Sequence, residues 1–119
     1  MALQQVIPQV FYDDIQIGLQ FFVDGLGFKL VYNDDTLYIV KRDEISLILF
    51  IDAESAKGDR PQIRIQTDDI EAIYNEIKTR SPKILHPNLS YIKNQPWGLR
   101  EFAALDPTTV CIVFQQALP

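Results

Sequence analysis

The hydrophobic and polar positions of this chain form a pattern that occurs twice. The segments PQVFYDDIQIGLQFF at 8–22 and PQIRIQTDDIEAIYNEI at 61–77 both begin with Pro-Gln, alternate, and pass through Asp-Asp-Ile into an amphipathic run. Alternation with a period of two is typical of a strand, and apolar spacings of three and four are typical of a helix. Each copy therefore predicts a strand that leads into a helix, and the echo indicates a duplicated module.

The two predicted helices have matching starts and apolar faces. One residue of Asp13–Asp14 is expected to cap the first helix and one of Asp68–Asp69 the second, because a carboxylate accepts hydrogen bonds from the free N–H groups there. Gly25 or Gly27 is expected to end the first helix. The expected faces are Ile15, Leu19, Phe22 and Val23 in the first helix and Ile70, Ile73, Tyr74 and Ile77 in the second.

Three short strands are predicted to follow each helix, from runs of β-branched and aromatic residues separated by turn-forming clusters. They cover 28–32, 37–41 and 45–51 in the first module. In the second, after an opening strand at 62–66, they cover 83–91, 101–105 and 110–115, with His86-Pro87-Asn88 interrupting the first of these three. Ala53–Arg60 is predicted to be a linker. The predicted fold class is α+β, one domain over 1–119 made of two βαβββ modules at about 5–52 and 61–116.

Composition narrows the classes of partner. A chain of 119 residues with 47% hydrophobic content is large enough for a packed core. A net charge of -5 disfavours nucleic acid and anionic lipid as partners and modestly favours a cation. No apolar run approaches the ~20 residues of a membrane span, and Met1–Val10 lacks the features of a signal peptide. A cytoplasmic protein is therefore expected.

Residues that carry chemistry are few. His86, the only histidine, lies in a turn-like stretch without an obvious orienting partner, so a half-exposed turn residue is the simpler interpretation than a ligand or general base. Cys111, the only cysteine, excludes an internal disulfide and lies in an apolar run, where a small core side chain is expected. The paired aspartates are accounted for as helix caps. No catalytic constellation is predicted.

Two segments, LQFFVDGLGFKLVYNDD at 19–35 and QPWGLREFAALDP at 95–107, carry a family likeness. With them the chain resembles, over nearly its whole length, the vicinal oxygen chelate superfamily of glyoxalases, dioxygenases and bleomycin resistance proteins, and the last of these in particular. The resemblance implies paired βαβββ modules whose curved mixed sheets form half-barrels, and a homodimer. It also implies one of two activities, a metal-dependent lyase or dioxygenase, or antibiotic resistance by sequestration of a drug at a dimer cleft.

The resemblance places the metal ligands of the enzymes at positions that here hold poor donors. These positions are Ile7 or Pro8, Gln62, a residue of Ile45–Ile51, and Val113. Divalent cations need several oxygen or imidazole donors, and only Gln62 has an amide oxygen to offer. We therefore predict no metal, no cofactor and a non-enzymatic binding protein. The alternatives are an enzyme of the same superfamily with a shifted metal site, and a structural or interaction module.

The resemblance also implies a ligand site around Trp97. In the resistance proteins this Trp stacks on the planar heteroaromatic part of the drug, and an aromatic of the partner subunit faces it; the candidates here are Tyr32 and Tyr38. The stiff Pro96 and the close-turning Gly98 are expected to let the indole project. The alternative is a tryptophan that anchors the loop to its own domain. The expected ligand is a small planar aromatic or cationic molecule.

Three further positions complete the predicted ligand site and one turn departs from the family. Phe50 and Gln62 belong to the site, and Arg64 lies two residues beyond Gln62 on the same strand face. Arg64 is either a positive charge that attracts an anionic group or an ordinary exposed or paired arginine. Thr108–Thr109 follows Asp-Pro where the family usually has Gly-Asn, and without glycine another turn type is expected, since a positive φ is costly there.

Overall fold

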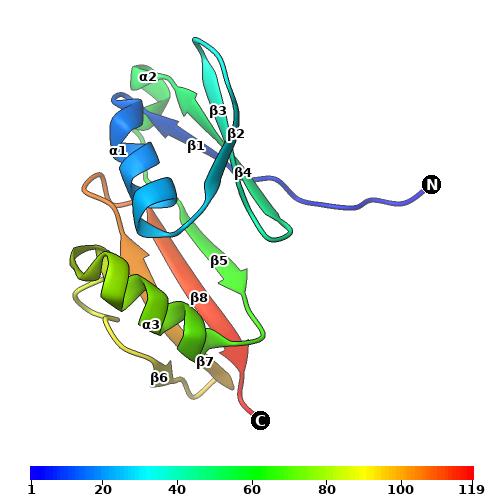
Figure 1. The fold of residues 1–119 in the computed structure, drawn as a ribbon, viewed down its shortest axis with the longest axis vertical. Coiled ribbons are helices and arrows are strands. Elements are labelled where there is room, and N and C mark those ends of the chain that lie inside the picture. Colours follow the sequence, from blue (N-terminus) through cyan, green and yellow to red (C-terminus); the bar gives the residue numbers. More distant parts are fainter. The chain divides into compact units, whose positions relative to one another are not determined.

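All 119 residues are described by the computed structural model, and the chain divides into two compact units, Met1–Asp59 and Arg60–Pro119. Each unit contains one open four-stranded mixed sheet with a helix along one of its faces (Figure 1). The predicted α+β class with two βαβββ modules is confirmed. None of the helices is long and apolar enough to cross a membrane.

In the first unit the last strand lies beside the first. The elements are β1 Gln9–Tyr12, α1 Ile15–Leu19, the π-helix η1 Gln20–Gly25, β2 Lys29–Asn33, β3 Leu37–Arg42, β4 Ile45–Ile51 and the short helix α2 Ala53–Ala56. The strand order is β1-β4-β3-β2, with β1 parallel to β4 and the other pairs antiparallel. The predicted strands of this unit are confirmed to within one residue at each end. The predicted linker begins instead with a helical turn, because Asp52 caps α2.

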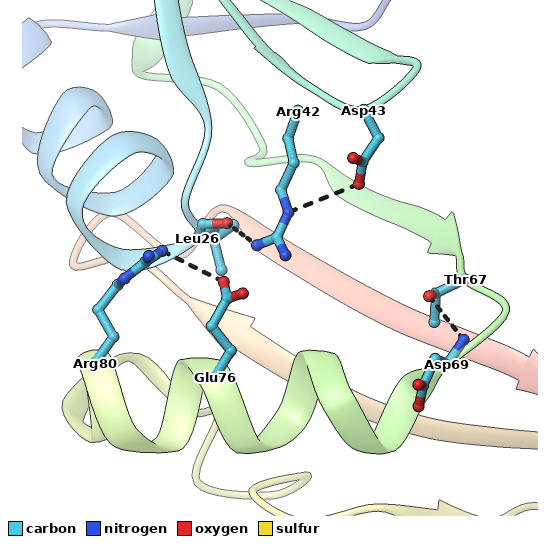
Figure 2. Close-up of polar contacts among 7 residues, drawn as sticks. All are labelled: Leu26, Arg42, Asp43, Thr67, Asp69, Glu76 and Arg80. Carbon is cyan, nitrogen blue, oxygen red and sulfur yellow. Dashed lines mark hydrogen bonds and ion pairs between the residues drawn. The ribbon is translucent and has the colours of Figure 1, made fainter.

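The helical stretch of the first unit is held at both of its ends. Asp14 caps α1, and its carboxylate accepts from the backbone N–H of Gln16 at 3.0 Å. After η1 the chain turns through Gly27, whose φ is 77. Arg42 then donates from Nη1 to the carbonyl of Leu26 at 2.7 Å and lies 3.9 Å from Asp43 (Figure 2). The end of β3 is thereby tied to the end of the helical stretch.

The second unit repeats this topology. Its elements are β5 Gln62–Gln66, α3 Ile70–Arg80, the 3-10 helix η2 Pro82–Ile84, β6 Lys93–Asn94, β7 Leu99–Leu105 and β8 Cys111–Ala117. The strand order is β5-β8-β7-β6, again with the first strand parallel to the last. Asp69 caps α3 by accepting from the N–H of Ala72, and its own N–H donates to Thr67 Oγ1 at 3.1 Å (Figure 2). Near the other end of α3, Arg80 pairs with Glu76 at 3.4 Å.

The strand predicted at 83–91 is wrong. The chain forms η2 there, and Leu85 makes only an isolated bridge to Ala104. Pro87 has no N–H to donate to a strand ladder, so pairing cannot run through this stretch. His86 serves the resulting turn, since its Nδ1 accepts from the backbone N–H of Asn88 at 3.0 Å.

Candidate functional site

Each sheet has a face covered by the helix of its own unit and an opposite face, called here the open face. In the second unit the ring of Tyr74 on α3 meets that of Phe102 on β7 at 5.2 Å, so Phe102 marks the covered face. In the first unit the ring of Tyr12 packs against Gly18 of α1 and marks the covered face in the same way. Because side chains alternate along a strand, Glu101 and Phe11 lie on the open faces.

The open face of the second sheet contains a buried carboxylate with a charged partner. Glu101 on β7 is 2% exposed at its side chain, and Oε2 accepts from Arg64 Nη1 at 2.7 Å. The side chain of Arg64 is 43% exposed, and the same Nη1 also donates a hydrogen bond to Gln115 Oε1 at 3.2 Å. Of the two interpretations of Arg64, the structure shows the paired arginine. Its charge on this face is matched by Glu101.

Trp97 lies in the turn between β6 and β7 and joins the same carboxylate. The N–H of Gly98 closes this turn on the carbonyl of Gln95 at 3.1 Å, and Gly98 has a φ of +90. The residue is 60% exposed, and its Nε1 donates to Glu101 Oε2 at 2.8 Å. The indole is therefore not a core anchor. One edge of the ring is held by Glu101 of the sheet, while most of the residue is exposed.

Gln62 lies on this open face as well, paired in register with Cys111 of β8. Gln62 is exposed and Cys111 half-buried. Burial raises the pKa of the Cys111 thiol, and the charge of Arg64 acts in the opposite direction. A raised pKa keeps the thiol protonated at neutral pH, so Cys111 lacks the thiolate that a nucleophile needs. The sheet thus brings Gln62, Arg64 and Trp97 onto or beside one face.

The open face of the first sheet is apolar. Phe11 and Phe50 are direct partners in the β1–β4 register and stack with centroids 5.7 Å apart. Phe50 also pairs with Leu37, and Ile39 pairs with Ile48, which places all of these side chains on one face. The rings are only half-buried. This face offers aromatic and aliphatic surface without a charged side chain beside Phe50.

Tyr32 reaches that face through an irregularity in β2. Leu30 pairs with Val40 and Tyr32 pairs with the next residue, Ile39, so Val31 is an extra residue in a β-bulge. The bulge reverses the alternation and turns Tyr32 toward the open face with Phe50. Tyr38 pairs with the buried Leu49 and lies on the covered face. The structure thus brings Tyr32 and Phe50 onto one face and separates Tyr38 from them.

The ring of Tyr32 is fixed by the hairpin turn that follows it. Its hydroxyl donates to Asp34 Oδ2 at 2.9 Å, and this hydrogen bond, with the charge of Asp34, raises the pKa of Tyr32. The other oxygen of Asp34 accepts from the backbone N–H groups of Thr36 and Leu37, which lowers the pKa of the carboxyl. The β2–β3 turn and the tyrosine therefore form one hydrogen-bonded unit.

Sequence reasoning missed three members of these faces, Phe11, Glu101 and Gln115. A signal for Glu101 was present, since it is the only carboxylate of the predicted strand at 101–105 and lies four positions after Trp97. Its pairing with Arg64, 37 positions away, follows only from the order of β5, β8 and β7. Phe11 had no separate signal, because its face depends on the pairing of β1 with β4.

The turn after β7 also differs from its expectation. Thr109 takes a φ of 75, so the positive-φ turn is kept without glycine, and the expected change of turn type is wrong. The buried carboxylate of Asp106 accepts from the N–H groups of Thr108 at 2.7 Å and Val110 at 3.0 Å. These hydrogen bonds hold the strained conformation in place.

The donor set does not fit the divalent metal of the superfamily's enzymes. Of the expected ligand positions, Val113 is buried and apolar, Ile7 precedes β1, and Ile45–Ile51 contributes no carboxylate or imidazole. Nowhere in the chain do three or more His, Cys, Asp or Glu side chains come together as a possible metal site. The only carboxylate on the strands of this sheet, Glu101, is engaged by Arg64 and Trp97.

Comparison with known proteins gives a consistent set of relatives. The sequence model of the Glyoxalase/Bleomycin resistance protein/Dioxygenase superfamily matches residues 3–114. A bleomycin resistance protein of Geobacillus stearothermophilus is 31% identical over 131 aligned positions, which cover 96% of this chain and 97% of the relative.

Solved structures with this fold include binding proteins and an enzyme. A bleomycin-binding protein complexed with bleomycin superposes with a TM-score of 0.80 at 21% identity, covering 98% of this chain and 100% of the other. A lactoylglutathione lyase from Agrobacterium tumefaciens gives a TM-score of 0.71 at 19% identity, covering 98% and 96%. At these identities the likeness establishes the fold.

Proposed function

This chain belongs to the Glyoxalase/Bleomycin resistance protein/Dioxygenase superfamily, and we propose that it binds a bleomycin-type drug and acts by sequestration, without catalysis. One observation carries the proposal: the half-exposed indole of Trp97 is held by a buried carboxylate on a strand instead of packing into the core. The bleomycin resistance proteins that align with nearly the whole chain support the choice of ligand.

The proposed mechanism is equilibrium capture. Trp97 offers a ring face to a planar aromatic group, and stacking contributes about 0.5–1.5 kcal/mol beyond the burial of area. Gln62 and Arg64 supply hydrogen-bond donors from the same sheet, while Tyr32 and Phe50 of a partner subunit supply the facing aromatic surface. The net charge of -5 attracts a cationic ligand.

We propose that the protein is cytoplasmic and forms a homodimer. The reason for the dimer is that the open face of the first sheet is apolar and a second copy would cover it. Phe11, Phe50 and their aliphatic neighbours are only half-buried within one chain. Burial of such surface is the main driving force for association. Light scattering should give twice the chain mass of 13.7 kDa at micromolar concentration. A mass of one chain would refute the dimer.

We also propose that binding needs no bound metal, which separates this chain from the enzymes of the superfamily. Among the expected ligand positions only Gln62 offers an oxygen of the kind these metals use, and divalent cations need several such donors. Dialysis against a chelator should leave the melting temperature and the affinity for metal-free bleomycin unchanged, since no folded-state metal is lost. A large fall on chelation, restored by one divalent ion, would favour the metal-dependent enzyme.

The decisive experiment compares Trp97→Ala with Tyr91→Ala. Tyr91 is a matched control because it is an aromatic residue with a similar exposed fraction, 58% against 60% for Trp97. It lies next to Ser90, whose carbonyl accepts a hydrogen bond from the hydroxyl of Tyr74 on α3. Calorimetric titration with bleomycin should show a penalty of roughly 2 kcal/mol or more for Trp97→Ala, as at a hot spot. Tyr91→Ala should bind like the natural chain. Unchanged affinity of Trp97→Ala, with a severe loss of urea stability, would sink the proposal.

A further inference from the structure

We infer that Glu101 is a positioning residue that sets both the orientation of the Trp97 indole and the charge preference of the open face of the second sheet. The inference rests on the proposed function, since it concerns which ligands that face accepts. It begins with one atom, Glu101 Oε2, which accepts from Trp97 Nε1 at 2.8 Å and from Arg64 Nη1 at 2.7 Å.

The first consequence concerns the indole. A 60% exposed side chain at a turn has few neighbours to select one rotamer. Glu101 supplies that selection, because its own side chain is 2% exposed within β7 and its charge makes the hydrogen bond strong. The bond also occupies the only polar atom of the indole. A ligand therefore meets the ring face and gains nothing from an acceptor aimed at Nε1.

The second consequence concerns charge. Arg64 alone would repel a cation from this face, but Glu101 balances it at 2.7 Å. Toward β5 the next groups along the face are neutral amides, since Arg64 also donates to Gln115, whose Nε2 reaches Gln66 at 3.4 Å. Toward β6 the face carries a second cation, the exposed Lys93, which is the register partner of Glu101. Glu101 is the only carboxylate on the four strands, so its removal should shift the preference of this face toward anions.

The indole can be tested without any ligand, because Trp97 is the only tryptophan. Glu101→Met removes the acceptor at similar length and should lower the fluorescence anisotropy and near-ultraviolet circular dichroism of Trp97. Glu101→Gln keeps an accepting oxygen and should preserve both signals. Glu71→Gln is the matched control. It removes the carboxylate on α3 that pairs with Arg100 at 2.8 Å, and it should change neither signal.

The charge preference can be tested with two probes of one ring system, N-methylacridinium and acridine carboxylate. Glu101→Gln should shift the ratio of their affinities about 10-fold or more toward the anion, as expected for an unbalanced charge near the ring. Glu71→Gln should move the ratio by no more than about twofold, because exposed charges are screened. Adding Arg64→Gln to Glu101→Gln restores the original net charge of the face and should restore the original ratio.

Each part of the inference has its own contrary result. Unchanged anisotropy in Glu101→Met overturns the positioning of the indole; if that variant does not fold, Glu101→Asp, one methylene shorter, should show the same loss. An unchanged ratio in Glu101→Gln, or no rescue by Arg64→Gln, overturns the charge preference. If the natural chain binds neither probe nor bleomycin, the proposed function fails and the charge preference with it, while the anisotropy comparison still decides the orientation of Trp97.

Discussion

Two stacked phenylalanine pairs occupy opposite faces in the two sheets. Phe11 and Phe50 are register partners on the open face of the first sheet, with centroids 5.7 Å apart. Phe102 and Phe114 are register partners on the covered face of the second sheet, 5.1 Å apart. The same local interaction therefore serves the core in one unit and an uncovered surface in the other.

The difference follows from the strands that carry the rings. β4 is apolar on both faces, as its sequence ISLILFI shows, which is typical of a strand meant to be covered twice. β7 and β8 place the rings of Phe102 and Phe114 on the covered face, and Glu101 and Gln115 lie among apolar neighbours on the open one. One topology, used twice, thus supplies an apolar surface from the first unit and a charged, hydrogen-bonded one from the second.

The largest effect is expected on the free energy of unfolding, when a ring from each of the two phenylalanine pairs is removed. Phe102→Ala removes a buried ring that touches Tyr74 and Phe114 and should cost about 3–5 kcal/mol in urea unfolding. Phe50→Ala removes a half-buried ring and should cost less than about 2 kcal/mol, with dimerisation and ligand affinity reduced instead. Equal stability losses in the two variants would mean that both open and covered faces belong to the core.

The next effect compares the buried and exposed ion pairs of the second unit. Arg64→Met leaves Glu101 charged and 2% exposed, with Trp97 as its remaining donor, and should cost about 2 kcal/mol in urea unfolding. Arg100→Met keeps a similar apolar stem and releases Glu71, which is 63% exposed, so the cost should stay below about 1 kcal/mol. A reversed order would show that the Glu101 site contributes nothing to folding.

A smaller, stabilising effect on the folded chain is expected at the hairpin turn that joins the last two strands of each unit. The turn between the last two strands holds Asp43 at a φ of 52 in the first unit and Thr109 at a φ of 75 in the second. A β-branched residue is strained there, so Thr109→Gly should stabilise the chain by about 1 kcal/mol after the entropy cost of glycine. Asp43→Gly should change stability little, because aspartate tolerates this region. Thermal unfolding measures both, and destabilisation by Thr109→Gly would argue against the strain.

The smallest effect concerns the turn that holds Tyr32. Backbone hydrogen bonds lower the pKa of Asp34 below its ordinary 3.8, so its stabilising contribution is present above that value and is lost as pH falls through the folded-state pKa. Asp34→Ala should therefore lose less melting temperature than the natural chain on acidification through this range. In Asp34→Ala part of the fall in melting temperature with pH should remain, because Asp52 also has a pKa lowered by hydrogen bonds from Ser55. Asp35→Ala, at the exposed neighbour, should follow the natural chain.

The repeated module was predictable from the sequence because its signals are local. Hydrophobic periodicity specifies which segments form strands and helices, and the caps at Asp14 and Asp69 act within three residues of themselves. Trp97 could be singled out for the same reason, since Pro96 and Gly98 flank it. The failures at 83–91 and Thr109 are also instructive. At His86 a distant partner, the carbonyl of Ala103, overrides the local preference. At Thr109 the hydrogen bonds that Asp106 accepts from Thr108 and Val110 hold a conformation that threonine disfavours.

The sequence by itself therefore determined most of the order of elements, the covered face of α3 and the family. The face expected for the first helix was wrong in part, because the chain continues after α1 as the π-helix η1, which buries Phe21 and leaves Leu19 and Val23 half-buried.

The tertiary structure alone decided which predicted residues share a surface. Tyr32 joins Phe50, and Tyr38 does not, because a bulge at Val31 shifts the alternation of β2 against β3. Glu101 meets Arg64 because β8 lies between their strands. Register and strand order depend on pairing between distant segments, and a period-two pattern is equally consistent with either face until that pairing is known.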